Sequence, residues 1–403
     1  MKKHPKILYI TYDGLSDALG QSQVLNYLSR LSELGNHIHI LSFEKAENLE
    51  KQLPIIQPII DQSGLNWHKL VYHKSPPIFS TLWDIHKGNK KIKALHSKHN
   101  FDIIHCRAYI PAMMGLKLKR ESGAKMIFDM RGWWADEKKD SGNWDELPFR
   151  PIYNYFKKRE KEFFSESDFT VSLTEAGKEK IQNEFGVPGH KVGVIPTCVD
   201  FSIFKTFDPS IRDRIRKELG IRQEAKVFVY SGSIGGNYDL QKLLHVFNCF
   251  KKIYPEHHLL ILSKYVVTNE VTDQIHAAGI MDYTIKNLSY REVSDYLIAG
   301  DIGLIFYKDA FSNIGRSPTK LGEYWASGVP VISFNGIGDL QYLFNKYPRG
   351  GFLLDEEMTD FNLKMKSVNW DMKEQLRKDA FEYFSLERGI DFYNNIYQKL
   401  NYK

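Results

Sequence analysis

The stretch SPTKLGEYWASGVPVISF, residues 317–334, contains the signals for a helix followed by a buried strand. Ser317 is a residue type that caps helix N-termini, and Pro318 suits the first helical position, where a missing N–H is harmless. The glycine of ASGVP can end the helix in a left-handed conformation, and the β-branched residues after it are typical of a buried strand. Lys320 is predicted in the first turn and Glu323 one turn further, so this helix start suits an anion beside a hydroxyl-bearing group.

Strands and helices alternate on both sides of this stretch. Apolar, β-branched segments recur along the chain, and amphipathic helical patterns follow them. Because this alternation is typical of parallel sheets covered on both faces, the sequence predicts an α/β protein with two doubly wound, Rossmann-like domains. The predicted strands are residues 6–12, 37–43, 101–106, 124–130 and 168–174 in one series and 226–232, 258–263, 282–288, 301–307 and 329–334 in the other.

The length of 403 residues also favours two domains. The residues from 200 to 210 show no clear periodicity and include Pro209, so we place the boundary there. The first domain is predicted at 1–205 and the second at 206–385. The last helix, about 386–403, is expected to pack back on the first domain.

The composition is that of an ordinary globular protein, with 42% hydrophobic and 26% charged residues. No apolar run approaches the roughly 18 residues of a membrane span, and the N-terminal segment lacks a cleavage site and is interpreted as a strand. The three cysteines, Cys106, Cys198 and Cys249, have no spacing typical of zinc or of a disulfide framework, which predicts a reducing cytoplasm.

The net charge of +6 is concentrated in the first 200 residues, which hold 29 Lys and Arg against 24 Asp and Glu. Within them a lysine cluster comprises Lys87, Lys90, Lys91, Lys93 and Lys98. The simplest explanation of this lysine cluster is that the lysines lie on solvated helix faces. The alternative is that they attract an anionic lipid surface or a polyanionic glycan. The alternative predicts salt-sensitive contact with the inner face of the cell membrane. Nucleic acid is not expected, because no binding motif accompanies the charge.

Two glycine-containing loops follow strands and are candidates for binding a ligand. GLSDALGQ contains Gly14 and Gly20, and YSGSIGGNYD contains Gly235 and Gly236. Bare backbone N–H groups in such loops can cradle phosphate oxygens, although neither loop has the dinucleotide-binding glycine pattern, and a plain turn is the alternative for each.

Charged side chains at strand ends are the second set of candidates, because ligands bind outside the carboxyl ends of parallel strands. His105, Arg131 and Lys264 hold such positions, and Arg316 and Thr319 flank the start of the predicted helix. In the segment DMRGWWADE the two tryptophans suit either stacking on sugar rings or core packing.

Metal-binding patterns are absent from the sequence. It contains no D-x-D pair, and His37 and His39 lack a third ligand. We therefore expect neither a metal nor another cofactor.

With these residues in view the chain resembles the family 4 retaining glycosyltransferases, whose GT-B fold has two Rossmann-like domains facing a central cleft. The resemblance covers nearly the whole chain and rests on both glycine loops, His105, the segment VIPTCVD and above all SPTKLGEYWASGVPVI. It implies a nucleotide-diphosphate-sugar donor held by the second domain and a glycan or lipid-linked acceptor held by the first, in synthesis of a surface polysaccharide or glycoconjugate.

The resemblance also implies roles for single residues. Glu323 matches the family's ribose-binding glutamate, and His105 matches the histidine that contacts the donor sugar. Lys320, with Arg131 and His105, is assigned to catalysis, and the diphosphate is assigned to Lys264, Arg316 and Lys320, with donor contacts from Ser317 and Thr319. The chain departs from the family pattern at Gly315, where an earlier glutamate is expected, and at Ser233 and Tyr238 in the glycine loop. Retention implies front-face displacement, with the departing diphosphate helping to deprotonate the acceptor.

Two other functions stay open at this point. A nucleotide-sugar epimerase shares the fold but needs carboxylates near the sugar, and Gly315 counts against it. A catalytically silent glycan-binding or lipid-binding protein is the alternative from another class. A dinucleotide dehydrogenase is less compatible, because its glycine fingerprint is missing.

Overall fold

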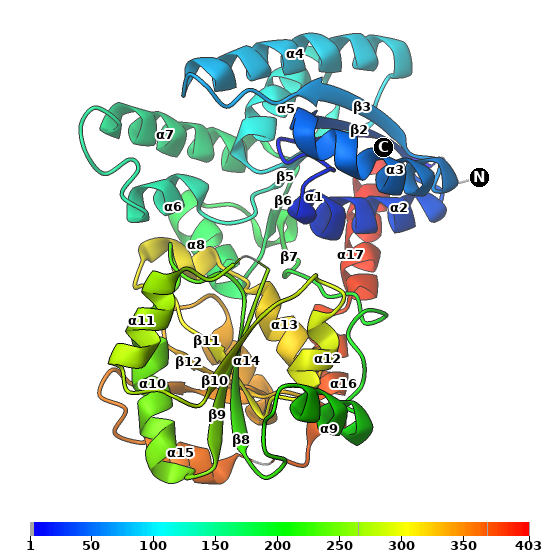
Figure 1. Cartoon of the computed structure of the whole chain (residues 1–403). Helices are drawn as coiled ribbons and strands as arrows, with labels where there is room; N and C mark the ends of the chain where they lie inside the picture. Colours follow the sequence, from blue (N-terminus) through cyan, green and yellow to red (C-terminus); the bar gives the residue numbers. More distant parts are fainter. Residues whose placement is uncertain (1–3, 265, 369, 403) are drawn as a thin grey trace. The chain divides into compact units, whose positions relative to one another are not determined.

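The computed structural model describes residues 4–264, 266–368 and 370–402. It divides into two compact units: the first comprises Met1–Pro196 and Glu387–Lys403, and the second comprises Thr197–Leu386. Each unit contains one parallel sheet with helices on both faces (Figure 1). The α/β class and the two doubly wound domains predicted from the sequence are confirmed.

The sheet of the first unit has seven strands in the order β3-β2-β1-β4-β5-β6-β7. Chain order reverses between β1 and β4, which is the switch point of a doubly wound sheet. Pairing is parallel throughout, with Leu8 of β1 between His39 of β2 and Ile104 of β4. The strands are β1 (Lys6–Thr11), β2 (His37–Glu44), β3 (Asn66–Val71), β4 (Ile103–Arg107), β5 (Lys125–Asp129), β6 (Phe169–Ser172) and β7 (Val192–Val194).

Parallel strands need crossover connections, and helices supply them in this unit. The helices are α1 (Ala18–Gly20), the π-helical turn η1 (Gln21–Leu25), α2 (Asn26–Glu33), α3 (Ala46–Gln62), α4 (Phe79–His99), α5 (Tyr109–Ser122), α6 (Trp134–Asp140), α7 (Arg150–Glu166), α8 (Glu175–Phe185) and the last helix, α17 (Leu386–Asn401).

The sheet of the second unit has six strands in the order β10-β9-β8-β11-β12-β13, again all parallel. They are β8 (Lys226–Ser231), β9 (His257–Ser263), β10 (Tyr283–Asn287), β11 (Ile302–Ile305), β12 (Val331–Phe334) and β13 (Gly351–Leu354). The helices are α9 (Pro209–Glu218), α10 (Leu240–Ile253), α11 (Asn269–Ala277), α12 (Val293–Ile298), α13 (Thr319–Ala326), α14 (Leu340–Lys346), α15 (Phe361–Ser367) and α16 (Lys373–Phe384).

Alternate residues of β8 show how this sheet is covered on both faces. Val227 and Val229 belong to one buried cluster, and Phe228 and Tyr230 belong to another. Since successive side chains of a strand point to opposite faces, the second unit has a core on each side of its sheet.

The contacts of the chain near residue 200 place the division after Pro196, earlier than the boundary expected near 205. Val199 pairs with Ser385 in a parallel bridge, and its N–H donates to the Phe384 carbonyl at 2.8 Å. Phe204 is fully buried in the core of the second unit. These backbone and core contacts attach residues from 197 onward to the second unit.

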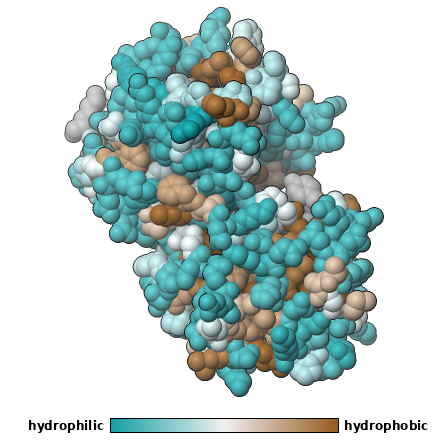
Figure 2. Space-filling model, turned by 90° about the vertical axis from the view of Figure 1, so that its left-hand side faces the viewer, coloured by the Kyte–Doolittle hydropathy of each residue, from teal (hydrophilic) through white to brown (hydrophobic). Residues whose placement is uncertain are grey.

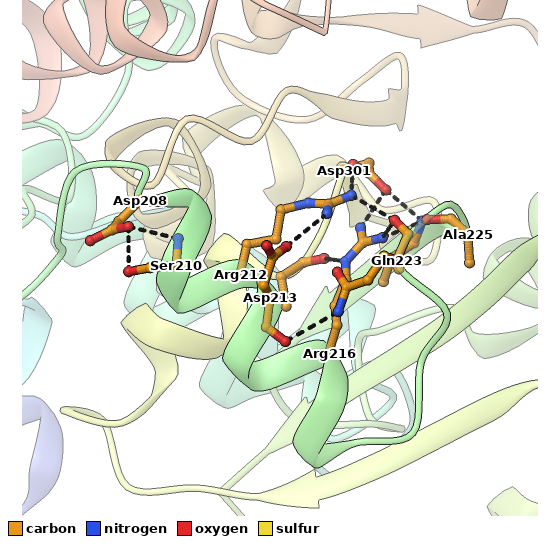
Figure 3. A network of polar contacts seen from close by, with 10 residues as sticks. Asp208, Ser210, Arg212, Asp213, Arg216, Gln223, Ala225 and Asp301 are labelled. Atoms are coloured by element: carbon orange, nitrogen blue, oxygen red, sulfur yellow. Dashed lines mark hydrogen bonds and ion pairs between the residues drawn. The ribbon is translucent and has the colours of Figure 1, made fainter.

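A buried arginine fastens α9 to the sheet of the second unit (Figure 3). The Arg216 guanidinium is fully buried and donates to the carbonyls of Ala299, Gln223 and Ala225 and to the Asp301 carboxylate. Asp301 also accepts from the Val227 N–H at 2.8 Å. Because a buried charge is tolerated only when its donors are satisfied, this network determines how α9 sits against the strand starts.

The last helix, α17, packs on the sheet of the first unit. The Tyr397 hydroxyl lies 2.7 Å from His105 Nδ1, and the Tyr393 hydroxyl donates to Asp129 at 2.9 Å. Asn394 accepts from Asn36 at 3.0 Å. These three hydrogen bonds thus join α17 to β4, to β5 and to Asn36, the residue before β2.

Two histidines, one on β2 and one on β3, form a partly buried pair. His39 Nδ1 and His68 Nε2 are 3.1 Å apart, so one ring must donate and the other accept. Burial, followed by the charges of neighbouring basic groups, lowers the pKa of His39 and that of His68 to about 4. The basic groups that act on the pair are His37, His99, Lys6, Lys91 and Lys98.

We expect the first unit to lose stability as pH falls. The folded pKa lies below the ordinary value near 6.5, so the unfolded chain binds more protons between pH 6.5 and about 4. The free energy of unfolding should therefore be highest above pH 6.5 and fall through that window. His39→Asn/His68→Gln should flatten this part of a urea-denaturation pH profile, whereas the exposed His190→Gln should leave it unchanged. If the free energy of unfolding changed equally with pH in the wild type and in both variants, the pH dependence would not come from the His39–His68 pair.

Candidate functional site

The start of α13 differs in detail from the sequence prediction. Pro318 is the N-cap residue, with non-helical backbone angles, and α13 begins at Thr319. The Ser317 hydroxyl does not cap this helix; it accepts from the Thr197 N–H at 3.1 Å. The predicted cap was wrong because the approaching backbone of Thr197, remote in sequence, competes for the same hydroxyl. Among the residues that the structure describes, no side chain caps the first turn of α13.

Lys320 is a buried ammonium without a hydrogen-bond acceptor among the residues that the structure describes. Its side chain is 7% exposed, and its Nζ lies 4.3 Å from the ring centroids of Tyr230 and of Tyr238. A Cβ at Gly232, where φ is +134°, would lie 2.7 Å from this Nζ. The glycine thus leaves the space that the ammonium occupies. Burial lowers the pKa of Lys320 to about 7, against the opposing charge of Glu323.

Glu323 lies one helical turn after Lys320 and is equally buried, with 7% exposure. Burial raises the pKa of Glu323 to about 7, although the Lys320 charge and a hydrogen bond from Tyr290 lower it. Burial thus works against the charged form of both groups. An anion at Lys320 would keep the ammonium charged, and hydroxyl donors at Glu323 would keep the carboxylate ionised.

The glycine loop after β8 is open beside these two side chains. Gly235 and Gly236 have φ of +87° and +62°, and a Cβ at either would meet nothing within 4 Å. Tyr238, at the end of the loop, forms an antiparallel bridge with Tyr307. Positive φ values favour glycine, so the backbone of this turn explains the residue type at both positions. The open space beside them leaves room for a ligand.

Arg316 also lies beside this loop. Its guanidinium stacks over the Tyr307 ring at 4.9 Å, and its Nε has no hydrogen-bond partner within the described chain. Lys264 directly follows β9 and is exposed, and Thr319 opens α13. The structure thus places Lys320 against the glycine loop, with Glu323 one helical turn after it. Arg316 reaches the loop through Tyr307, which pairs with Tyr238.

Tyrosines complete this site, and the sequence argument did not predict them. Tyr230 and Tyr238 flank the Lys320 ammonium, Tyr307 supports Arg316, and Tyr290 contacts Glu323. Only their positions in the sequence could have indicated these tyrosines. Tyr230 and Tyr307 are near the ends of predicted strands, and Tyr238 occupies a loop position where the family pattern has a cation.

The first glycine loop is filled by a side chain of the protein itself. The buried Glu44 carboxylate accepts from the N–H groups of Leu15 and Ser16 at 2.8 and 3.0 Å. A Cβ at Gly14 would lie 2.7 Å from Glu44 Oε2, and one at Gly20 would lie 1.9 Å from the Gly14 carbonyl. Close packing against this carboxylate accounts for Gly14, and close packing against the backbone of Gly14 accounts for Gly20. A contact of this loop with the donor stays a prediction.

His105 lies inside the first unit. It is 1% exposed; its Nδ1 faces Tyr397, and its Nε2 lies 3.6 Å from Asp129 Oδ2. Burial lowers the pKa of His105, opposed by Asp129. The structure therefore shows an internal histidine that joins the sheet to α17, and its contact with a donor sugar stays a prediction.

Arg131 lies at the end of β5 in a conformation that non-glycine residues rarely adopt, with φ of +56°. Its Nη1 is 3.9 Å from Asp129 Oδ1. Burial opposes the ionisation of Asp129, but the charges of Arg131 and Arg107 and the His105 hydrogen bond hold its pKa below the ordinary value. Strain next to a charged cluster at strand ends is a feature of functional sites.

The aromatic segment after Arg131 forms part of the core. Trp133 is fully buried and stacks with Phe185 at 6.1 Å, and Trp134 packs edge-on against Trp144 and Phe156. Sugar stacking by Trp133 is therefore excluded in this conformation, because its ring faces the interior.

The described residues contain neither a metal-binding cluster nor a membrane-spanning helix. No group of three or more His, Cys, Asp or Glu side chains is arranged to hold a metal ion among them. No helix within the described ranges is long and apolar enough to cross a membrane.

Comparison with known proteins shows a family resemblance in the first part of the chain. Residues 20–202 match the family model described as Glycosyltransferase Family 4. Over these residues the chain is similar to the family 4 glycosyltransferases. The chain has no significant match among curated proteins.

Solved structures share its fold over nearly their whole length. A glycosyltransferase from Rickettsia africae ESF-5 is 15% identical and has a TM-score of 0.72, covering 99% of both chains. Anabaena Alr3699/HepE in complex with UDP-glucose is 11% identical with a TM-score of 0.67, covering 98% of this chain and 100% of that one. The lipopolysaccharide outer core galactosyltransferase WaaB is 13% identical with a TM-score of 0.64, covering 98% and 99%. At these identities the likeness shows the fold, which is GT-B.

Proposed function

We propose that this protein is a glycosyltransferase that moves a sugar, with retention of configuration, from a nucleoside-diphosphate sugar to a glycan or lipid-linked acceptor in synthesis of a surface polysaccharide or glycoconjugate. The observation that carries the donor assignment is the Lys320 ammonium, which is buried beside an open glycine loop without an acceptor among the described residues. A buried charge is costly unless a partner compensates it. A diphosphate would be that partner.

The neighbouring groups fit the rest of a nucleotide donor. Arg316, with its Nε unpaired, would add charge to the diphosphate site. The Glu323 carboxylate can accept from the two adjacent hydroxyls of a ribose. The structural neighbour Alr3699/HepE in complex with UDP-glucose supports a nucleotide sugar as the donor class.

The proposed chemistry is a front-face displacement without a protein nucleophile. As the bond from the sugar to the diphosphate breaks, negative charge grows on the leaving oxygen, and Lys320 and Arg316 would stabilise it. The departing diphosphate takes part in removing the acceptor proton. Position 315 is glycine, so the carboxylate that the family pattern has there makes no contact with the sugar in this protein.

The pH dependence of donor binding follows from the two shifted groups. Diphosphate binding favours the charged form of Lys320, whose pKa is lowered to about 7, so affinity should fall above pH 7. Ribose binding favours ionised Glu323, whose pKa is raised to about 7, so affinity should also fall below pH 7. Calorimetry in buffers of different ionisation enthalpy should detect net proton uptake at pH 8 and net release at pH 6. If the number of protons taken up or released on binding did not change with pH, Lys320 would not bind the diphosphate and Glu323 would not bind the ribose in the way proposed.

Transfer itself is tested by product analysis. The full chain is incubated with pooled nucleoside-diphosphate sugars and acceptor extracts, and products are identified by mass spectrometry, with the anomeric configuration determined by NMR. A glycosylated acceptor with retained configuration is expected. An altered donor sugar without transfer would identify an epimerase, and the absence of any turnover would identify a binding protein.

A further inference from the structure

The loop between β10 and α12 contains a tyrosine, Tyr290, that is 38% exposed. This loop follows the carboxyl end of β10, and ligands bind at that edge of a parallel sheet. Hydrophobic side chains also occur in small groups over the face of the second unit that Figure 2 shows, so exposure alone does not mark a functional residue. Tyr290 is distinguished by the two side chains that it contacts, one in the core and one in the donor site.

The contact in the core fixes the position of the Tyr290 ring. The ring lies edge-on to that of Phe204, with the two centroids 5.6 Å apart, and Phe204 is fully buried. The backbone before Tyr290 is held as well. The N–H of Leu288 donates to the Ser263 carbonyl at 3.0 Å, and that of the next residue donates to the Glu292 carboxylate at 2.8 Å. The ring therefore has a defined place at the edge of the core.

The contact in the donor site is made by the Tyr290 hydroxyl, which donates to the Glu323 carboxylate. Burial raises the pKa of Tyr290, and the negative charges of Glu323 and Asp200 raise it further. The phenol therefore stays protonated, and remains a donor, throughout the neutral range. Because a carboxylate has about four acceptor positions, this bond leaves positions for the hydroxyls of a ribose.

The same hydrogen bond favours the charged form of Glu323. Burial raises the pKa of Glu323 to about 7, whereas the Lys320 charge on α13 and the Tyr290 hydrogen bond lower it. The other titratable groups around the pair are Asp200, which acts on Tyr290, and Tyr324, on which Glu323 acts. Loss of the Tyr290 hydroxyl alone would therefore raise the pKa of Glu323 further.

We propose that Tyr290 is a positioning residue for the donor, whose hydroxyl holds the Glu323 carboxylate in the orientation that accepts from the ribose. This inference rests on the proposed role of Glu323. Phe204 fixes the ring, the ring fixes the hydroxyl, and the hydroxyl fixes the carboxylate before the ligand arrives. An acceptor that is already ordered loses less conformational freedom on binding, so the donor is bound more tightly.

The test uses Tyr290→Phe, which removes the hydroxyl and keeps the ring against Phe204. Calorimetric affinity for a ribonucleoside diphosphate should fall about three- to tenfold relative to the wild type at pH 7. The loss should be larger at pH 6 than at pH 9, because Glu323 without this hydrogen bond is protonated at higher pH. The matched control is Tyr283→Phe on β10, which removes a hydroxyl 2.9 Å from His276 Nε2 and should bind like the wild type.

A double-mutant cycle separates positioning from direct contact with the ligand. If Tyr290 acts through Glu323, then Tyr290→Phe should cost less than about twofold in the Glu323→Gln background. A full further loss there, or equal losses at pH 6 and pH 9, would overturn the positioning role. Wild-type affinity of Tyr290→Phe with weakened binding by Glu323→Gln would overturn this inference alone. Wild-type affinity of Glu323→Gln would instead overturn the proposed ribose contact, and the role of Tyr290 with it.

Discussion

Replacing Lys320 with methionine should weaken binding of nucleoside diphosphates by roughly 2 to 3 kcal/mol, about 30- to 150-fold. Methionine fills the space between Tyr230 and Tyr238 without supplying charge, so the variant removes the proposed phosphate contact and keeps the packing. Isothermal titration calorimetry measures the effect. The corresponding nucleoside without phosphates should bind as it does to the wild type, because Lys320 is assigned to phosphate alone.

The stability of the same variant separates a binding role from a structural one. The Lys320 ammonium has no hydrogen-bond acceptor in the described chain, so its removal relieves a desolvation cost and thermal stability should not decrease. Lys366→Met, at an exposed position of the second unit, serves as the control for loss of charge. Wild-type diphosphate affinity combined with a lower melting temperature would make Lys320 part of the scaffold.

Replacing Glu323 with glutamine should weaken donor binding by roughly 1.5 to 3 kcal/mol, about 13- to 150-fold. The amide keeps the shape of the side chain but offers a neutral oxygen to the ribose hydroxyls. Burial raises the pKa of Glu323 to about 7, so the titration belongs at pH 8, where the wild-type carboxylate is ionised and the contrast is greatest.

Two comparisons make this second experiment specific. A 2′-deoxynucleoside diphosphate should already bind weakly to the wild type and lose little more in Glu323→Gln, because the hydroxyl that the carboxylate accepts from is missing. Glu374→Gln, on the exposed surface of α16, should behave like the wild type. An equal loss for ribose and deoxyribose nucleotides would refute the ribose contact.

Much of the fold could be predicted because its signals are local. Strands β1, β2, β4, β5, β6, β8, β9, β10, β11 and β12 coincide with apolar segments recognised in the sequence. The remaining strands, β3, β7 and β13, were missed. They are short or only half buried: β3 has the pattern NWHKLV, and β7 and β13 contain three and four residues. Such segments become strands because a neighbouring strand offers them hydrogen bonds, which no local pattern records.

The candidate site, like the fold, could be predicted from the sequence only in part. The run SPTKLGEYW was sufficient to indicate Lys320 and Glu323, because their spacing of three residues puts them on one face of a helix. The sequence could not show that Tyr230 and Tyr238 flank the ammonium, or that Gly232 leaves room for it. These contacts join β8 and the loop after it to α13, which are remote from each other in the sequence.

The sequence by itself thus determined the class, the alternation of strands and helices and the charged helix start, since propensity and periodicity act over a few residues. Only the tertiary structure decided which polar groups are already satisfied. It assigned the amides at Leu15 and Ser16 to Glu44 and the Ser317 hydroxyl to Thr197, and it left Lys320 without an acceptor among the described residues. The reason is physical: the partner of a buried polar group is set by distance in space, and residues close in space are often remote in sequence.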